Sequence, residues 1–97
     1  MRPSEALAKH IDEVRAILAR YPVRNPRVFG SVARGEDADA SDLDILVDHD
    51  GLVSTFDLAR LEIELERVLS TRVDIKTSGD FSTTVARSVD RDVMPIS

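Results

Sequence analysis

Residues 30–47 read GSVARGEDADASDLDILV, and the second half of this stretch carries the clearest structural signal in the chain. From Asp42 onward, Leu43, Ile45 and Val47 alternate with Asp42, Asp44 and Leu46, which is the period of two that is typical of a β-strand. The apolar residues that share one face of this strand are Leu43, Ile45 and Val47. We expect that face to pack against helices, so that Asp42 and Asp44 project together from the other face.

A third acid is expected beside this pair. Residues 72–76 form another short alternating segment, in which Val73 and Ile75 face the helices and Asp74 faces the other way. If the two strands are neighbours in one sheet, the carboxylate of Asp74 joins the two aspartates of the first strand in a single patch.

Three clustered carboxylates repel one another unless their pKa values rise or a hard cation lies between them. Magnesium prefers one or two carboxylates together with water and phosphate oxygens. Two such ions about 3.5–4 Å apart clamp the attacking and leaving oxygens of an in-line displacement. The pattern therefore predicts that Asp42, Asp44 and Asp74 bind Mg²⁺, as two ions.

A phosphate site is expected at Gly30 and Ser31, which follow a predicted strand and precede a short helical segment. Free backbone N–H groups and the helix dipole favour an anion at such a junction. Gly30 allows the backbone to approach closely, and the Ser31 hydroxyl can donate to a phosphate oxygen. Arg34 lies one turn later, where it could pair with a phosphate or with the acidic loop.

The rest of the chain alternates helix and strand signals. Ser4 is the expected N-cap of an amphipathic helix that ends before Pro22. The expected elements are helix 4–20, turn 22–26, strand 27–29, a tight turn with a short helical segment at 30–35, loop 37–41, strand 43–47, closing turn 48–51, helix 55–69, strand 72–76, turn 77–80, helix 81–91 and edge strand 94–96. This order predicts an α/β (α+β) fold, with a small mixed β-sheet of three to four strands flanked by helices.

The composition predicts one domain spanning residues 1–97, without cysteines for disulfides or thiolate metal sites. No apolar stretch has membrane length, so a soluble, cytoplasmic protein is expected. The net charge of −5 disfavours a direct nucleic-acid track. Seven acids lie between Glu36 and Asp50, and an ordinary solvated loop remains an alternative interpretation of that run.

The combination of these motifs resembles a known signature. GSVARG at residues 30–35, six further positions ending in Ser41, and then DLDILV are similar to the motif of the DNA polymerase β-type nucleotidyltransferases. The resemblance is closest to the minimal nucleotidyltransferase (MNT) branch, whose pattern is GSxARG, a short loop, and SDxD followed by apolar residues. It covers essentially the whole chain, because Asp74 falls where that family has its third acid.

This resemblance implies a polymerase β-type fold and a role for each matching residue. Gly30 and Ser31 would hold the β- and γ-phosphates of the nucleotide, and Arg34 would support them. Asp42 and Asp44 would bind both metal ions. Asp74 would complete the second metal site and help to deprotonate the attacking hydroxyl.

The resemblance also implies a substrate and a partner. Minimal domains of this kind are typically paired with a HEPN-domain ribonuclease in a toxin–antitoxin module. The nucleotidyltransferase, as antitoxin, transfers AMP from ATP to a tyrosine of its partner. Two alternatives stay open, namely a small-molecule acceptor such as an aminoglycoside, bound by a homo-dimer of the domain, and an inactive relative that only binds its partner.

Other metal chemistry is disfavoured by spacing. Asp37, Asp39 and Ser41 resemble the first positions of an EF-hand loop, but the glycine required at its sixth position is replaced by Asp42. His10 and His49 have no partner at ligand spacing and are interpreted as surface residues.

Overall fold

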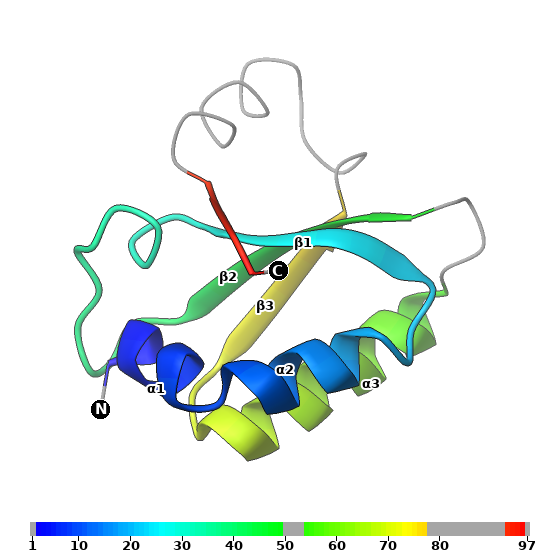
Figure 1. The fold of residues 1–97 in the computed structure, drawn as a ribbon, viewed down its shortest axis with the longest axis horizontal. Helices are drawn as coiled ribbons and strands as arrows, with labels where there is room; N and C mark the ends of the chain where they lie inside the picture. The colour runs from blue at the N-terminus through cyan, green and yellow to red at the C-terminus, as the bar shows by residue number, and fades with distance from the viewer. Residues whose placement is uncertain (1, 50–53, 78–92, 97) are drawn as a thin grey trace.

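The structure is a computed structural model that describes residues 2–49, 54–77 and 93–96. In chain order, its elements are α1 (Pro3–Lys9), α2 (Ile11–Leu18), β1 (Val23–Phe29), β2 (Leu43–His49), α3 (Thr55–Leu69), β3 (Val73–Thr77) and β4 (Met94–Pro95). The strands form one four-stranded sheet in the order β3-β2-β1-β4, and in the described residues the helices lie together on one side of it (Figure 1). The predicted mixed sheet flanked by helices is therefore confirmed.

The two kinds of strand pairing follow from the connections. β1 pairs with β2 and β4 in antiparallel fashion, whereas β2 and β3 run parallel. Helix α3 supplies the long crossover that parallel strands require. β2 and β3 therefore run side by side in the same direction, as the convergence of the three aspartates requires.

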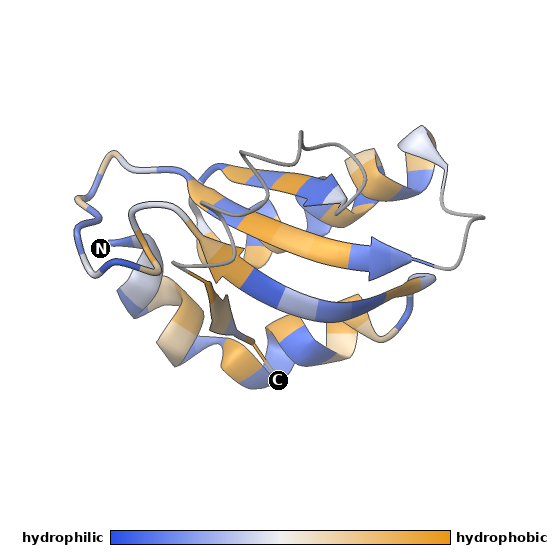
Figure 2. Ribbon diagram, turned by 90° about the horizontal axis from the view of Figure 1, so that it is seen from above, coloured by the Kyte–Doolittle hydropathy of each residue, from blue (hydrophilic) through white to orange (hydrophobic). Residues whose placement is uncertain are grey.

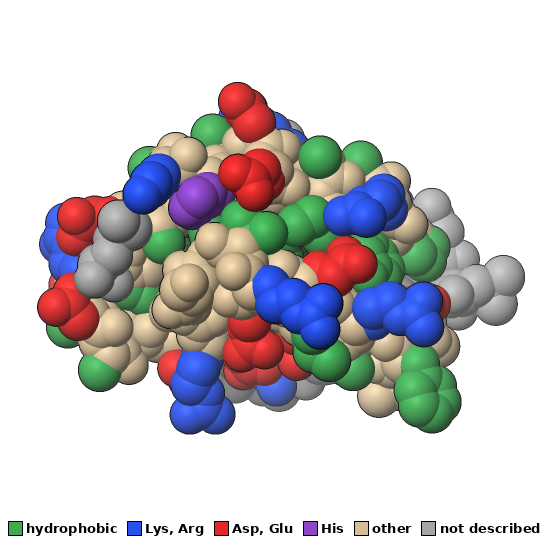
Figure 3. Space-filling view, turned by 90° about the horizontal axis from the view of Figure 1, so that it is seen from below, with side chains coloured by type: hydrophobic (Ala, Val, Ile, Leu, Met, Phe, Trp, Pro, Cys, Tyr) green, Lys and Arg blue, Asp and Glu red, His purple; other side chains and the backbone are tan. Residues whose placement is uncertain are grey.

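The core lies between the sheet and the helices. The apolar side chains predicted for this face of β2 are fully buried, and Val73 and Ile75 of β3 extend the same layer. Helix α3 contributes Leu61, Leu65 and Leu69 from one face. Apolar and polar residues interleave along the helices, as amphipathic elements require (Figure 2). The outer surface of the helix layer mixes acidic and basic side chains (Figure 3).

Helix α3 has the predicted bounds. Ser54 is its N-cap, with its hydroxyl oxygen accepting the Asp57 N–H at 3.1 Å, and the Asp57 carboxylate accepts the Ser54 N–H in return. This reciprocal capping box satisfies donors that the first turn leaves unpaired. The left-handed conformation of Ser70, with φ 54, ends the helix.

The predicted N-terminal helix is wrong at its start and in its continuity. The N-cap residue is Arg2, not Ser4, because the Ser4 N–H donates to the Asp37 carboxylate across 33 positions of sequence. His10, with φ −113 and ψ 24, separates α1 from α2. The two segments have different tertiary partners, since α1 is tied to the loop that holds Asp37 while α2 packs mainly on α3.

Strand β1 is longer than predicted and runs through the expected turn at 22–26. Its register with β2 shifts between Arg24 and Arg27, and Asn25 there has a positive φ of 51. Such a bulge accommodates Pro26, which cannot donate a ladder hydrogen bond. The Pro26 carbonyl instead accepts the Ile96 N–H at 3.0 Å. The tertiary pairing with β2 and β4 thus overrides the local turn signal.

Other boundaries differ by small amounts. β2 extends to His49, because its last residues pair with Val23 and Arg24 of β1. β3 is shifted by one residue, because its pairing with β2 runs from Val73 to Thr77. Residues 30–35 are hydrogen-bonded turns without the predicted helical segment. The predicted edge strand near residue 94 is confirmed as β4. The predicted helix 81–91, which carries Arg87 and Arg91, lies outside the described residues.

None of the helices in the described part of the chain has the length and apolar character needed to span a bilayer.

Candidate active site

The structure brings Asp44 and Asp74 together. They are register partners on β2 and β3, so their side chains leave the sheet from the same face, about 4.8 Å apart between strands. That face is the one opposite the helices, because Leu43 and Ile45 on either side of Asp44 point into the core. Asp42 comes immediately before β2 and is exposed. The sequence prediction that the two strands are neighbours is confirmed.

Gly30 lies directly against the carboxylate of Asp44. Phe29, the last residue of β1, is the register partner of Asp44, so Gly30 follows at the same edge of the sheet. A Cβ atom at Gly30 would lie 2.9 Å from Oδ2 of Asp44, and Gly30 has a positive φ of 73. Both the close approach and the dihedral angle favour glycine here. The chain can therefore bring a bound phosphate next to Asp44.

The loop after Gly30 is organised by its own backbone. The Arg34 N–H donates to the Gly30 carbonyl at 3.2 Å, and the Glu36 N–H donates to the Ser31 carbonyl at 2.8 Å. Val32 is buried and anchors the loop in the core. The Ser31 side chain has no hydrogen-bond partner within the described ranges, whereas Arg34 pairs with Glu36 at 3.1 Å. Arg34 is thus engaged within the exposed loop.

The electrostatics of the face centre on Asp44. Its partial burial, followed by the negative charges of Asp74 and Asp42, raises the pKa of Asp44 above its ordinary value, with Lys76 opposing the shift. Lys76 Nζ lies 3.6 Å from Asp74 Oδ1, and Arg72 Nε lies 3.9 Å from Asp42 Oδ1. The sequence interpretation missed these two cations, although their alternation with Asp74 on one strand was the signal that would have found them.

The three aspartates fit a hard cation chemically. Their donors are all carboxylate oxygens, and burial, followed by the charges of Asp74 and Asp42, raises the pKa of Asp44, which a cation would oppose. In the described part of the chain, no three acidic or imidazole side chains are gathered closely enough to hold a metal as they stand. Asp42 and Asp74 are turned toward Arg72 and Lys76, so metal binding requires these two side chains to rotate.

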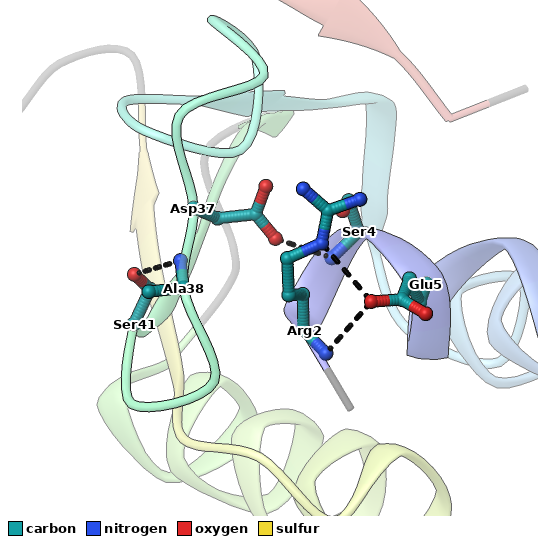
Figure 4. A network of polar contacts seen from close by, with 6 residues as sticks. All are labelled: Arg2, Ser4, Glu5, Asp37, Ala38 and Ser41. Carbon is teal, nitrogen blue, oxygen red and sulfur yellow. Dashed lines mark hydrogen bonds and ion pairs between the residues drawn. The ribbon is translucent and has the colours of Figure 1, made fainter.

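Asp37, another acid of the same stretch, is not part of this face. Its carboxylate is buried and accepts the Ser4 N–H at 2.9 Å, next to the Arg2–Glu5 pair at the start of α1 (Figure 4). Burial acts to raise the pKa of Asp37, but hydrogen bonds from Ser4 and the charge of Arg2 outweigh it and lower the pKa. The loop leads into strand β2 and not into the second helix of an EF-hand.

Comparison with protein families identifies the class. The family model of the nucleotidyltransferase domain matches residues 7–94, so the chain belongs to this family. It is also 39% identical, over 91% of its length and 86% of the relative's, to protein adenylyltransferase MntA of Thermococcus cleftensis. The predicted membership of the nucleotidyltransferases, and the resemblance to their minimal branch, are thereby confirmed.

Solved structures share the fold. A structure described as a minimal nucleotidyltransferase superposes with a TM-score of 0.84 at 38% identity, covering 95% of this chain and 94% of the other. A toxin–antitoxin structure with AMP-PNP has a TM-score of 0.78 at 20% identity over 90% of this chain and 72% of that chain. A complex of a tri-AMPylated Shewanella oneidensis HEPN toxin with its MNT antitoxin has a TM-score of 0.71 at 17% identity, covering 93% of this chain and 71% of that chain.

Proposed function

We propose that this chain transfers AMP from ATP to a tyrosine hydroxyl of a HEPN-type ribonuclease toxin and so acts as its antitoxin. The observation that carries the proposal is the register pairing of Asp44 with Asp74, with Gly30 against the Asp44 carboxylate. A phosphate-binding turn and a pair of acids at one edge of a sheet are what transfer of a nucleotide requires.

The residues of the candidate active site have separate roles in this reaction. Gly30 and Ser31 bind the β- and γ-phosphates, and Arg34 supports them when it leaves Glu36. Asp42, Asp44 and Asp74 would hold magnesium, which would neutralise charge on the triphosphate. The acceptor oxygen forms a bond to the α-phosphorus, pyrophosphate leaves as the bond to its bridging oxygen breaks, and the hydroxyl proton passes to the carboxylate of Asp74.

Two comparisons support the donor and the acceptor. The relative from Thermococcus is a protein adenylyltransferase, and the fold neighbours include an antitoxin whose HEPN partner carries AMP. Asp44 lies on the face of the sheet opposite the core side chains of Leu43 and Ile45, so an acceptor that reaches it from that face need not displace them. The net charge of −5 disfavours a nucleic-acid acceptor.

The test is reconstitution with a HEPN-type protein, to be sought first in the neighbouring reading frame, using magnesium and ATP labelled at its α-phosphate. We expect label on a tyrosine of the partner, loss of its toxicity on co-expression, and no labelling in chelator. Asp42→Asn/Asp44→Asn should still bind the partner but transfer at least about 10²-fold more slowly. Asp12→Asn is the matched control, because Asp12 is almost fully exposed on α2 and should transfer normally.

Two results would overturn the proposal. Full rescue by Asp42→Asn/Asp44→Asn would mean that the chain neutralises its partner by binding alone. Labelling of an aminoglycoside, with none on the partner, would mean that the acceptor is a small molecule.

A further inference from the structure

Strand β3, which carries Asp74, forms an edge of the sheet, since β2 is its only neighbouring strand among the described residues. Along a parallel edge strand, alternate residues turn their backbone groups toward the neighbour and away from it. Arg72 faces β2, because its carbonyl accepts the Leu43 N–H at 2.8 Å. The N–H groups of Val73 and Ile75 therefore point outward, and they flank Asp74 on both sides.

Two glutamates of α3 accept these outward donors. Glu66 Oε2 lies 3.2 Å from the Val73 nitrogen, and Glu62 Oε1 lies 2.9 Å from the Ile75 nitrogen. Residues four apart on a helix share a face and are about 6 Å apart along its axis, close to the roughly 6.6 Å between alternate residues of a strand. The two carboxylates therefore match the two donors, and both hydrogen bonds are partly buried.

The same carboxylates border the candidate active site. A polar hollow of about 340 Å³ opens at this edge of the sheet, and the residues that line it are Asp42, Glu62, Glu66, Arg72, Val73 and Asp74. The two glutamates are thus held against the backbone of β3 on one side of Asp74, while Asp44 lies on the other side, on β2.

We propose that Glu62 and Glu66 are positioning residues for Asp74, holding β3 in register so that the Asp74 carboxylate stays beside Asp44. This role rests on the proposed function. A helix that is hydrogen-bonded to the backbone on both sides of one residue restricts the direction of that residue's Cα–Cβ bond. A displacement near 1 Å at a reacting group costs up to about 10²-fold in rate. What the role requires is a hydrogen-bond acceptor at each position, with or without a negative charge.

The experiment compares Glu62→Ala and Glu66→Ala with Glu62→Gln and Glu66→Gln, because glutamine removes the charge but keeps an acceptor oxygen. Glu64→Ala is the matched control, since Glu64 lies on the same helix but faces Arg20 at 3.6 Å. Each variant is assayed for AMP transfer at saturating ATP, for the Kd of Mg-ATP, and for amide hydrogen exchange at Val73 and Ile75. The alanine and glutamine variants are also built on Asp74→Asn.

We expect each alanine variant to expose its amide to exchange and to lose about 10-fold in transfer, with the Kd of Mg-ATP within about two-fold of wild type. Glutamine should restore transfer. On Asp74→Asn, the alanine substitutions should cost little more, because residues that act through one group are not additive. A merely stabilising role would instead add its full loss in both backgrounds.

Three outcomes overturn the proposal. The first is normal transfer in the alanine variants, and the second is an undiminished loss on Asp74→Asn. The third is a glutamine variant that is folded and protected from exchange yet inactive. This third outcome tests the positioning role even if the alanine variants fail to fold. Transfer that needs Asp74 but neither glutamate overturns this role alone, whereas wild-type transfer that survives Asp74→Asn overturns the proposed function as well.

Discussion

Asp37 and Asp44 come from the same acidic stretch, yet the structure shifts their pKa values in opposite directions. Asp37 lies in the loop against the start of α1, where hydrogen bonds from Ser4 prevail over burial and lower its pKa. Asp44 lies on the exposed face of the sheet, where partial burial and the charges of Asp74 and Asp42 raise its pKa. The fold favours the charged form of Asp37, although its buried Oδ1 has no hydrogen-bond partner among the described residues, and disfavours the charged form of Asp44.

The contrast separates two uses of an acidic residue. The charge of Asp37 is favourable in the folded protein because the backbone N–H of Ser4, at the start of α1, donates a hydrogen bond to its carboxylate. The charge of Asp44 is unfavourable there, and a cation or the ligand that accompanies it would reverse this. Selection for stability alone would not gather three carboxylates on one face. The mutual repulsion of Asp44 and Asp74 therefore indicates a functional site.

The largest expected difference between Asp44 and Asp37 is in the rate of AMP transfer. Asp44→Asn should lower AMP transfer by at least about 10²-fold, because it removes a carboxylate from the metal-binding face. Asp37→Asn, the same chemical change, should leave the rate within about three-fold of wild type, because Asp37 contacts no part of that face. Initial rates with α-labelled ATP measure both. Equal losses in the two variants would show that the aspartates do not differ in function.

A smaller effect concerns the free energy of unfolding. Asp37→Ala should destabilise the protein by about 1 kcal/mol, or roughly 4–8 °C in Tm, because it leaves the Ser4 N–H without its acceptor. The folded-state pKa of Asp37 is lowered, so its contribution is present above the ordinary value of 3.8 and disappears as the pH falls through the lowered pKa. Thermal unfolding of wild type and variant from neutral to acidic pH measures the difference, which should shrink in acid. A difference that grew in acid would contradict the assigned shift.

The smallest effect is expected for the stability of Asp44→Asn, measured without divalent cations. The raised pKa of Asp44 means that the folded protein holds this proton more tightly than the unfolded chain. Wild-type stability therefore falls as the pH rises from the ordinary value of 3.8 through the raised pKa. At neutral pH the variant should have the higher Tm, and below 3.8 the two should coincide. A variant less stable than wild type at neutral pH would mean that the Asp44 charge is compensated in the fold.

Local patterns in the sequence predicted much of this molecule. Alternation in residues 42–47 identified β2 and the face that carries Asp42 and Asp44, because a strand turns successive side chains to opposite sides. The bounds of α3 were predictable because its apolar period lies within the helix itself. The nucleotidyltransferase motif worked for the same reason, since its glycine, serine and aspartates are close in sequence.

The features that were missed depend on contacts between distant segments. The break at His10 and the passage of β1 through Pro26 follow from packing and strand pairing, which override local signals. The use of Glu62 and Glu66 as acceptors for β3 is equally invisible in the helix that carries them. Their spacing alone is that of any solvated helix face.

The sequence by itself determined which residues share a strand or helix face, because backbone geometry sets those periods. Only the tertiary structure decided which faces meet. It paired Asp44 with Asp74, placed Gly30 against the Asp44 carboxylate, and placed Asp37 against the start of α1. The charge of an aspartate is stabilised or destabilised by groups that folding brings from elsewhere in the chain. For that reason Asp37 and Asp44, which come from one acidic run, have pKa values shifted in opposite directions.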